Sequence, residues 1–551
     1  MPSQEHIVNR QILDFSFPSR QAAMDGQNRL SQIFKRDLIP LMQQVFDEVV
    51  SPDDHLRIRR LEVDLGELSA GNFEKELAGK LTSQLEDQLR RHLQYAQTNR
   101  TSDRAKSTQL NDQNAVEVRI ASSQQKAIEL FTTFIQTGRY PWWAGKTTAA
   151  SPDQLARLLV DEKTGEFKTL FTTLYQSEVY SRRLIHQLSD STLEQILLLA
   201  GNRLPNAKIR SLMDDLMKLH TISSLVPLNR ANFRLLVWRT VFDIWVEKDG
   251  YQKHIHPERS KPGSTPSDRK RNQIKKSLEF FLFCFLNKLA VSSGKKHLQP
   301  GRQHYLQLQI RFLQRSVSAA GMQGGPLGKF LHSVNSVKPA EWKSIEQETG
   351  IQYDIRGKEA SKAGKQVQDS SQKMDKDRKI DSKTEVDRLE VKNAGLVLIA
   401  PFLPIFFDTL GLLKEKEFIT PQAAEQAALI LQYIVAGDTE MPEHELILNK
   451  ILCGIDIDEP LPQHLDIGDR EIDEVNNLLD SVIEHWSALN GTSVQGLRDT
   501  FINREGTLAP QQNGWKLFVE RITPDVLIDR LPWSISIIKL PWTNEIIQTE
   551  W

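Results

Sequence analysis

Residues 394–413, AGLVLIAPFLPIFFDTLGLL, determine whether this chain crosses a membrane or folds around a buried core. The run approaches the roughly 20 apolar residues that a helix needs to span a bilayer. Pro401, Pro404 and Asp408 interrupt it, and a proline inside a helix removes a hydrogen bond and bends the axis. We therefore interpret the run as a pair of buried helices bent at the prolines, with a membrane span as the alternative.

The residues that follow carry clear helix boundaries. Thr420 and Pro421 are typical of an N-cap and a first helical position, and Gly437 is typical of a helix end. A second helix is expected over residues 443–453, and a third over 472–489 because its apolar residues share one face. This part of the chain is thus predicted to be a helical domain.

The end of the chain changes to the alternation of apolar and polar residues that is typical of strands, at 515–519, 535–538 and 547–551. Two Leu-Pro-Trp tripeptides, ending at Trp533 and Trp542, bracket the middle strand. Tryptophans so placed either build the core of a small β-meander or form a docking face. We predict a core role for Trp533 and a docking role for Trp542.

The first hundred residues combine short strands with long helices. Alternation predicts strands at 13–17, 56–58 and 61–65, with a bulge or register change between the last two. Between the first two, Ser19 is expected to cap a long helix that bends at Pro40. The pattern predicts a small α+β domain.

A further helix carries leucine or phenylalanine at every fourth position from Phe73 to Leu93. A four-residue step advances a helix by about 400°, so the apolar stripe drifts by about 40° per step. Two interpretations stay open. The helix either wraps around a partner or packs on the small sheet of its own domain.

Residues 121–319 are predicted to be almost purely helical. A helix over 124–138 ends at a glycine suited to the left-handed position after a helix, and the aromatic cluster RYPWW follows at 139–143. Residues 279–286 are apolar nearly all round, which is typical of a fully buried helix. Cys284 within them is interpreted as an inert core residue.

The predicted fold class is mainly α and multi-domain, with a small N-terminal α+β domain and a C-terminal helical domain ending in a short β-meander. Two segments poor in apolar residues are interpreted as linkers, because they cannot bury enough surface to offset chain entropy. The predicted order is an N-terminal domain at 1–100, a helical domain at 120–250, a basic linker at 251–277, a helical region at 278–355, a charged flexible linker at 356–392 and the C-terminal domain at 393–551.

Composition restricts the classes of partner. The 551 residues include 70 Lys and Arg against 71 Asp and Glu, so no overall charge favours nucleic acid or an anionic membrane, and we expect neither. Cys284 and Cys453 lie too far apart in sequence for zinc or redox spacing. The N-terminus lacks the basic and apolar regions of a secretion signal, which favours a cytoplasmic location.

The sequence offers no convincing catalytic, cofactor or metal site. Residues 321–329, GMQGGPLGK, resemble a phosphate-binding loop, but Gln323 stands at the first glycine position and Phe330 replaces the hydroxyl residue. His254 and His256 form a pair without an acidic or cysteine cluster nearby to complete a metal site. We therefore predict a protein that is not an enzyme and needs no cofactor.

Short strings at both ends of the chain form an ordered set. They are RLEVDLG at 60–66, GRYPWW at 138–143, APFLP at 400–404 with Phe407 and Leu410, LNKILCG at 448–454, EHW at 484–486, FINREG at 501–506 and the two LPW tripeptides leading to Trp551. Together they resemble the contractile injection system tape measure family. Residues from about 205 to 390 carry no such string.

The resemblance implies a structural and assembly protein of a phage-tail-like extracellular particle, which sets the length of the inner tube. Its partners would be the inner-tube, hub or spike and baseplate proteins, with a homo-oligomer as a further option. It would act in the cytoplasm during assembly and end inside the released particle. A baseplate or hub assembly chaperone absent from the finished particle is the alternative, and a nucleotide-binding enzyme is a remote one. We expect the chain to dock on its partners through Trp142, Trp143, Trp542 and Trp551.

One expectation conflicts with this resemblance. A ruler should be a long helix or an extended rod, at most about 830 Å if every residue were helical at about 1.5 Å per residue. The capped helices and tryptophan-rich end predict compact domains instead. A folded chain of this kind must unfold or rearrange to measure length.

Overall fold

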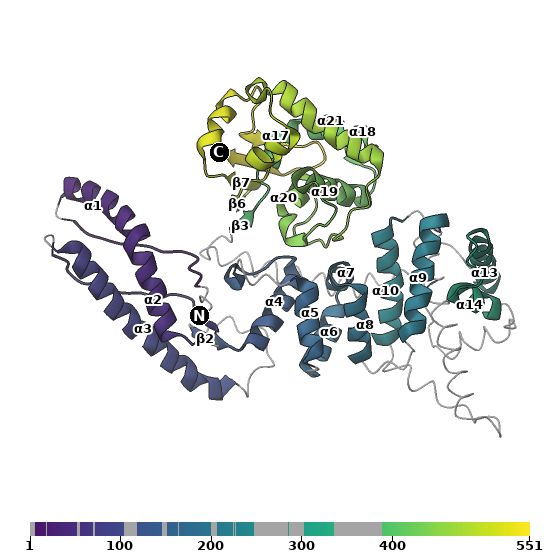
Figure 1. Ribbon diagram of the computed structural model, residues 1–551, viewed down its shortest axis with the longest axis horizontal. Coiled ribbons are helices and arrows are strands. Elements are labelled where there is room, and N and C mark those ends of the chain that lie inside the picture. Colours follow the sequence, from purple (N-terminus) through teal and green to yellow (C-terminus); the bar gives the residue numbers. More distant parts are fainter. Residues whose placement is uncertain are drawn as a thin grey trace. The chain divides into compact units, whose positions relative to one another are not determined.

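A computed structural model describes residues 6–17, 19–51, 55–69, 72–103, 118–145, 151–162, 165–199, 206–223, 225, 228–246, 285, 302–334 and 388–551. These residues are mostly helical, as predicted. The chain divides into two compact units, one formed by Met1–Phe134 with Arg139–Phe167 and the other by Ile135–Gly138 with Lys168–Trp551. Figure 1 traces the chain through both units in sequence colours.

The first unit is built around long helices and a two-stranded sheet. Its elements are α1 (Arg20–Ile33), the π-helical turn η1 (Phe34–Leu38), α2 (Ile39–Val49), β1 (His55–Ile58), α3 (Phe73–Asp103), β2 (Val118–Ala121), most of α4 (Ser123–Thr137), the 3₁₀ turn η2 (Trp142–Ala144) and α5 (Pro152–Asp161). β1 and β2 pair antiparallel, with His55 opposite Ala121. α2 and α3 pack against each other (Figure 1).

The leucine stripe of α3 is buried within its own unit. Leu77 packs with Leu30 and Ile33 of α1, and Leu85 and Leu89 pack with side chains of α2. α3 also contacts β2. Of the two interpretations of the drifting stripe, the structure therefore supports packing inside the domain.

The helix before this stripe changes its hydrogen bonding next to Pro40, where the sequence predicts a bend. The N–H of Ile39 donates to the carbonyl of Phe34, five residues earlier, so the chain forms a π-turn between α1 and α2. A proline cannot donate, and its ring crowds the carbonyl four residues before it. Widening the turn just ahead of Pro40 accommodates both effects without ending the helix.

Two of the predicted N-terminal strands are wrong. In the described part of this unit only β1 and β2 pair, and residues 13–17 and 61–65 have no regular secondary structure. Their alternating apolar side chains, among them Phe15, Phe17 and Val63, pack against the helices instead. The predicted bulge at residues 59–60 is the end of β1.

The second unit begins with a run of helices. They are α6 (Gly165–Tyr175), which starts in the first unit, α7 (Glu178–Gln187), α8 (Asp190–Leu199), α9 (Asn206–Ser223), α10 (Arg230–Val246), α13 (Arg302–Ala319) and α14 (Pro326–Val334). Gly138 follows α4 with φ +73°, the left-handed conformation predicted for it. Of the predicted helix at 279–286 the structure describes only Phe285, which is fully buried. Cys284 lies outside the described residues.

Residues 388–551 of the second unit, called the C-terminal domain below, share one cluster of buried apolar side chains. Its helical elements are α17 (Leu396–Ile399), η3 (Ala400–Phe402), α18 (Leu403–Thr409), α19 (Pro421–Ala436), η4 (Glu443–Glu445), α20 (Ile447–Leu452), α21 (Asp469–His485), η5 (Ser487–Leu489), α22 (Val494–Leu497), η6 (Arg498–Ile502) and η7 (Thr523–Arg530). The predicted caps of α19 are confirmed, because Thr420 Oγ1 accepts from the Ala423 N–H and Gly437 has φ +68°.

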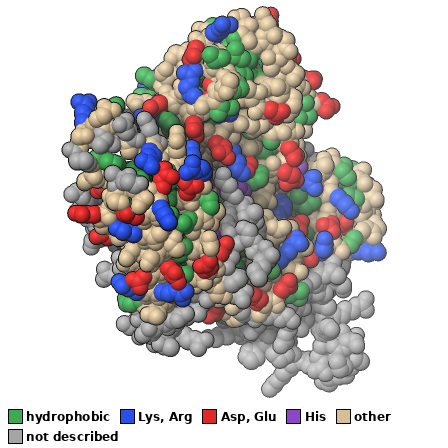
Figure 2. Space-filling view, turned by 60° about the vertical axis from the view of Figure 1, so that its left-hand side comes forward, with side chains coloured by type: hydrophobic (Ala, Val, Ile, Leu, Met, Phe, Trp, Pro, Cys, Tyr) green, Lys and Arg blue, Asp and Glu red, His purple; other side chains and the backbone are tan. Residues whose placement is uncertain are grey.

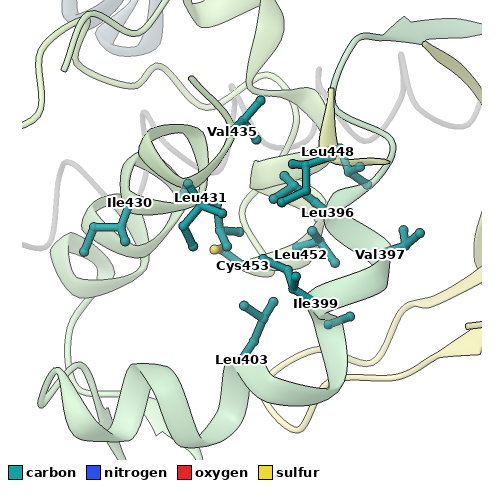
Figure 3. Close-up of a cluster of buried hydrophobic side chains, with 14 of the residues drawn as sticks. Leu396, Val397, Ile399, Leu403, Ile430, Leu431, Val435, Leu448, Leu452 and Cys453 are labelled. Carbon is teal, nitrogen blue, oxygen red and sulfur yellow. The ribbon is translucent and has the colours of Figure 1, made fainter. Parts of the chain in front are cut away.

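The apolar run at 394–413 forms the centre of this core. α17, η3 and α18 follow one another, with Pro401 in η3 and Pro404 in the first turn of α18. Figure 3 shows Leu396 and Leu403 of this run beside α19 and α20. The prediction of buried helices bent at the prolines is confirmed. Among the residues that the structure describes, no helix combines the length and apolar character that crossing a membrane requires.

The C-terminal sheet corrects the predicted meander. Its strands are β3 (Leu389–Val391), β6 (Gly506–Gln511), β7 (Gly514–Phe518), β8 (Ile537–Ile538) and β9 (Ile546–Glu550), in the order β3-β6-β7-β9-β8. β7 and β9 run parallel, whereas a meander is antiparallel throughout. The chain leaves the sheet through η7 after β7 and returns so that β9 lies between β7 and β8. A separate hairpin joins β4 (Leu413–Lys414) and β5 (Glu417–Phe418).

Candidate docking site

In the aromatic cluster at 139–143, Trp142 is exposed to solvent and Trp143 is held in place by its neighbours. Trp142 begins the 3₁₀ turn η2 between Pro141 and Gly145, and its side chain is 55% exposed. Trp143 is half-buried, and the guanidinium carbon of Arg57 lies 3.8 Å from its ring centroid. Arg57 is in turn paired with Glu129. The turn is thus held on one side by a cation–π contact while Trp142 faces outward.

The two Leu-Pro-Trp tripeptides anchor their indoles in the same way. The Trp533 N–H donates to the carbonyl of Leu398, and the Trp542 N–H donates to the carbonyl of Leu452, each at 2.9 Å. The Trp542 ring also lies 5.1 Å from the Phe418 ring. Both tryptophans are half-buried. The docking role of Trp542 stays a prediction, and it concerns only the part of the ring that its own domain leaves exposed.

Trp551 closes a buried ionic network. Its indole N–H donates to Asp525 Oδ2 at 3.0 Å, and Arg504 donates to both oxygens of Asp525 at 2.6 and 3.0 Å. Burial would raise the pKa of Asp525, but the hydrogen bonds from Arg504, the Ile522 N–H and Trp551 lower it below its ordinary value. Trp551 is half-buried, so its docking role also stays a prediction.

The four predicted docking residues are divided between the two units. Trp142 and Trp143 belong to the first unit, and Trp542 and Trp551 to the second. Within the second unit, Trp542 packs on phenylalanines while Trp551 packs beside Arg504. These two rings have different neighbours and form no shared patch in the described structure.

The second unit contains a buried charge cluster that no sequence pattern predicts. Arg183 of α7, Glu443 of η4 and Lys450 of α20 each have side chains that are 2% exposed or less. Arg183 Nε lies 3.1 Å from Glu443 Oε1, and Lys450 Nζ lies 2.9 Å from the same oxygen. Burial lowers the pKa of Lys450, and its contact with Glu443 opposes that shift. The one sequence feature that points to this cluster is the pair of arginines directly before the apolar Leu184 and Ile185 in a short helix.

The glycine run has a structural explanation. Asp215 of α9 places its Oδ2 atom 2.9 Å from the Leu327 N–H in the first turn of α14. A phosphate bound by a glycine-rich loop would occupy this kind of position at a helix N-terminus. The carboxylate of Asp215 fills it, which agrees with the rejection of a phosphate site. His254 and His256 lie outside the described residues, and the described residues contain no cluster of three or more metal-binding side chains.

Figure 2 shows acidic and basic side chains interspersed over the face that it draws. Mixed charge of this kind favours contact with other proteins over attraction to a uniformly charged polymer.

The comparison with protein families defines the class as the structural, non-enzymatic proteins of contractile injection systems. A family model described as contractile injection system tape measure protein matches residues 5–551. The chain therefore belongs to the tape measure family, and the resemblance seen at its two ends extends over nearly its whole length. Comparisons with curated proteins and with solved structures gave no match. The protein works as part of a contractile injection particle, and its partners lie within that particle.

Proposed function

We propose that this tape measure protein docks on the assembling particle through Trp142. The observation that carries the proposal is a 55% exposed tryptophan at the start of a turn that is already held in place. Pro141 restricts the backbone ahead of the ring, and the Arg57 guanidinium fixes Trp143 behind it. A ring that is ordered before binding loses little entropy in the complex, which is typical of residues that dominate binding energy.

The partner that fits is an apolar pocket on an inner-tube, hub, spike or baseplate protein. Trp143, Trp542 and Trp551 are proposed as secondary docking residues, because each leaves only part of its ring exposed. We propose no nucleic acid or membrane partner, since the net charge is −1. Assembly would take place in the cytoplasm, after which the chain would lie inside the released particle. A homo-oligomer stays a prediction.

An assembly chaperone at the baseplate or hub would need the same docking turn. The two roles differ in whether the chain stays in the finished particle. Quantitative mass spectrometry of purified particles separates them. A fixed ratio of this chain to the hub protein supports the ruler that remains in the tube, whereas its absence supports the chaperone.

Replacing Trp142 with alanine is expected to impair particle assembly without unfolding the protein. Truncation of a central interface tryptophan costs about 2 to 4 kcal/mol of binding, so docking should weaken by about 30-fold to 1,000-fold. Electron microscopy of purified particles should then show low yield or irregular tube length. Leu158→Ala is the matched control, because Leu158 is equally exposed in the same unit. Normal yield and length with Trp142→Ala would exclude the docking turn.

A further inference from the structure

The C-terminal domain contacts α7 through polar groups. Arg182 Nη2 lies 3.2 Å from Glu425 Oε1, and its other terminal nitrogen pairs with Glu459. Two carboxylates of the domain thus converge on one arginine of the helix. Burial raises the pKa of Glu425 above its ordinary value despite the nearby Arg182 and a hydrogen bond from Asn232 of α10.

The end of α7 adds neutral hydrogen bonds to the same domain. Gln187 is fully buried and donates from Nε2 to the carbonyl of Leu461 at 3.0 Å. Gln463 donates in turn to Gln187 Oε1 at 2.8 Å. These contacts fix the orientation of the helix on the domain, because each group needs a partner in a defined direction.

Arg183 lies at the centre of the contact and reaches both sides of it. It donates to Glu443 and to the carbonyl of Asp458 in the C-terminal domain, and to the carbonyls of Ile135 and Gln136 at the end of α4, at 2.7 and 3.0 Å. The chain passes close to this cluster at Gly138. A Cβ atom there would lie 2.7 Å from Glu443 Oε1.

The charged groups on the two sides of this contact also have hydrogen-bond partners on their own side. In the C-terminal domain, Glu443 is neutralised by Lys450, whose ammonium also donates to the carbonyl of Ile457 at 3.1 Å. On the helical side, Arg183 keeps the two carbonyls of α4. If the halves separated, neither Glu443 nor Arg183 would lack a partner, and water would replace the remaining bonds.

The hydrophobic core of the C-terminal domain is complete without α7. Every buried member of its cluster lies between Val391 and Ile547, and the half-buried side chains packed against it come from the same domain. The apolar burial that holds a domain together is therefore separate from the polar contact with α7. Ion pairs at such a contact add orientation more than net stability.

We propose that this contact is a separable joint, from which the C-terminal domain can undock as a folded body. Arg182 and Arg183 hold the docked arrangement together with Gln187 and with Asn232 of α10. The inference goes beyond the docking function, and it supplies the rearrangement that a folded ruler needs before it can extend. Because it concerns the chain alone, its test requires no assembled particle.

Replacing Arg182 with glutamate in the full-length chain tests the joint. The new carboxylate would face Glu425 and Glu459, so like charges should open the contact. Spin labels at Leu198→Cys and Ile405→Cys report the separation, since both positions are more than half exposed. Cys284→Ser removes one native thiol, and Cys453 is fully buried with a raised pKa, so it should not react.

The expected result is a longer and broader distance distribution in Arg182→Glu, with the unfolding transition of the C-terminal domain unchanged. Adding Glu459→Arg to that variant should restore the original distance. Arg239→Glu is the control, because Arg239 pairs with Glu178 inside the helical part at 3.2 Å. Unchanged distances in Arg182→Glu, or loss of the C-terminal unfolding transition in that variant, would overturn the separable joint.

Discussion

Replacing Gly395 with alanine is expected to destabilise the C-terminal domain by more than about 3 kcal/mol, because the new methyl group would strike backbone rather than a side chain. A Cβ at this position would lie 1.8 Å from the carbonyl oxygen of Phe501 and 2.5 Å from Cα of Ile502. The Gly395 N–H donates to the carbonyl of Ile502 at 3.2 Å, so the two chain segments cross in direct contact. Gly395 has φ −68°, and the cost therefore comes from space and not from its own conformation.

Neither segment can move aside easily. Leu396 and Ile502 are fully buried, so a shift of either backbone would disturb the centre of the core. A loss of this size is a large fraction of the about 5 to 15 kcal/mol that stabilises a typical domain. Urea unfolding followed by tryptophan fluorescence measures it, since half of the ten tryptophans lie in this domain.

Gly79→Ala is the matched control for Gly395. Gly79 lies within α3, and a Cβ there would have no heavy atom within 4 Å. Alanine in a helix interior is favoured over glycine by about 1 kcal/mol, so this variant should be neutral or slightly stabilised. If Gly395→Ala lost less than about 1 kcal/mol, the close crossing of the two segments would be disproved.

Replacing Asp525 with alanine is expected to cost about 3 to 5 kcal/mol, because it leaves a nearly buried guanidinium without its carboxylate. Asp525 is fully buried and accepts hydrogen bonds from Arg504, from the Ile522 N–H and from the Trp551 indole. Removing it therefore breaks four hydrogen bonds from three residues at once. The free energy of unfolding from urea titration measures the loss, and Trp551 emission should shift to longer wavelength as its ring loosens.

Asp529→Ala provides the comparison. Asp529 pairs with Arg521 at 2.7 Å, but its side chain is 60% exposed, so solvent screens the interaction. Its replacement should leave stability nearly unchanged. Equal stabilities of the Asp525→Ala and Asp529→Ala variants would contradict the assignment of a buried ionic network.

The sequence predicts those parts of the fold that depend on local chemistry. Thr420 and Gly437 mark the two ends of α19 because capping is decided within one helical turn. Alternation predicts the strands at residues 515–519 and 547–551, but it does not predict that the two strands pair in parallel. The direction of pairing depends on the path of the chain between the two strands. Alternation along each strand is the same whether the strands pair parallel or antiparallel.

Strands that lack a strong pattern were missed. β6 contains Gly506 and Pro510, which weaken the alternation, and β3 has three residues at the end of the segment predicted to be a linker. Residues 13–17 show the opposite error, because a segment before α1 that has no regular secondary structure also alternates apolar and polar residues. Both errors come from long-range contacts that override local preference.

The sequence identifies tryptophans as candidate docking residues, but it does not show which of them is the most exposed. Only the structure separates the exposed Trp142 from Trp542, whose ring is partly used by its own domain. Arg183 and Glu443 are 260 positions apart, and no local pattern connects them. Their pairing follows from the packing of α7 against the C-terminal domain, which a single sequence does not reveal.

The most direct test of the ruler is to measure the length of the inner tube in particles assembled with a shortened tape measure chain. The segment at 356–387 suits the experiment because its composition predicts a spacer, so removing about half of it should leave the flanking regions folded. Protease-resistant fragments verify that control. Deleting about 16 residues should shorten the tube by about 24 Å if the segment is helical in the particle, or by about 53 Å if it is extended. Particles with an unchanged length distribution in electron micrographs would contradict the account.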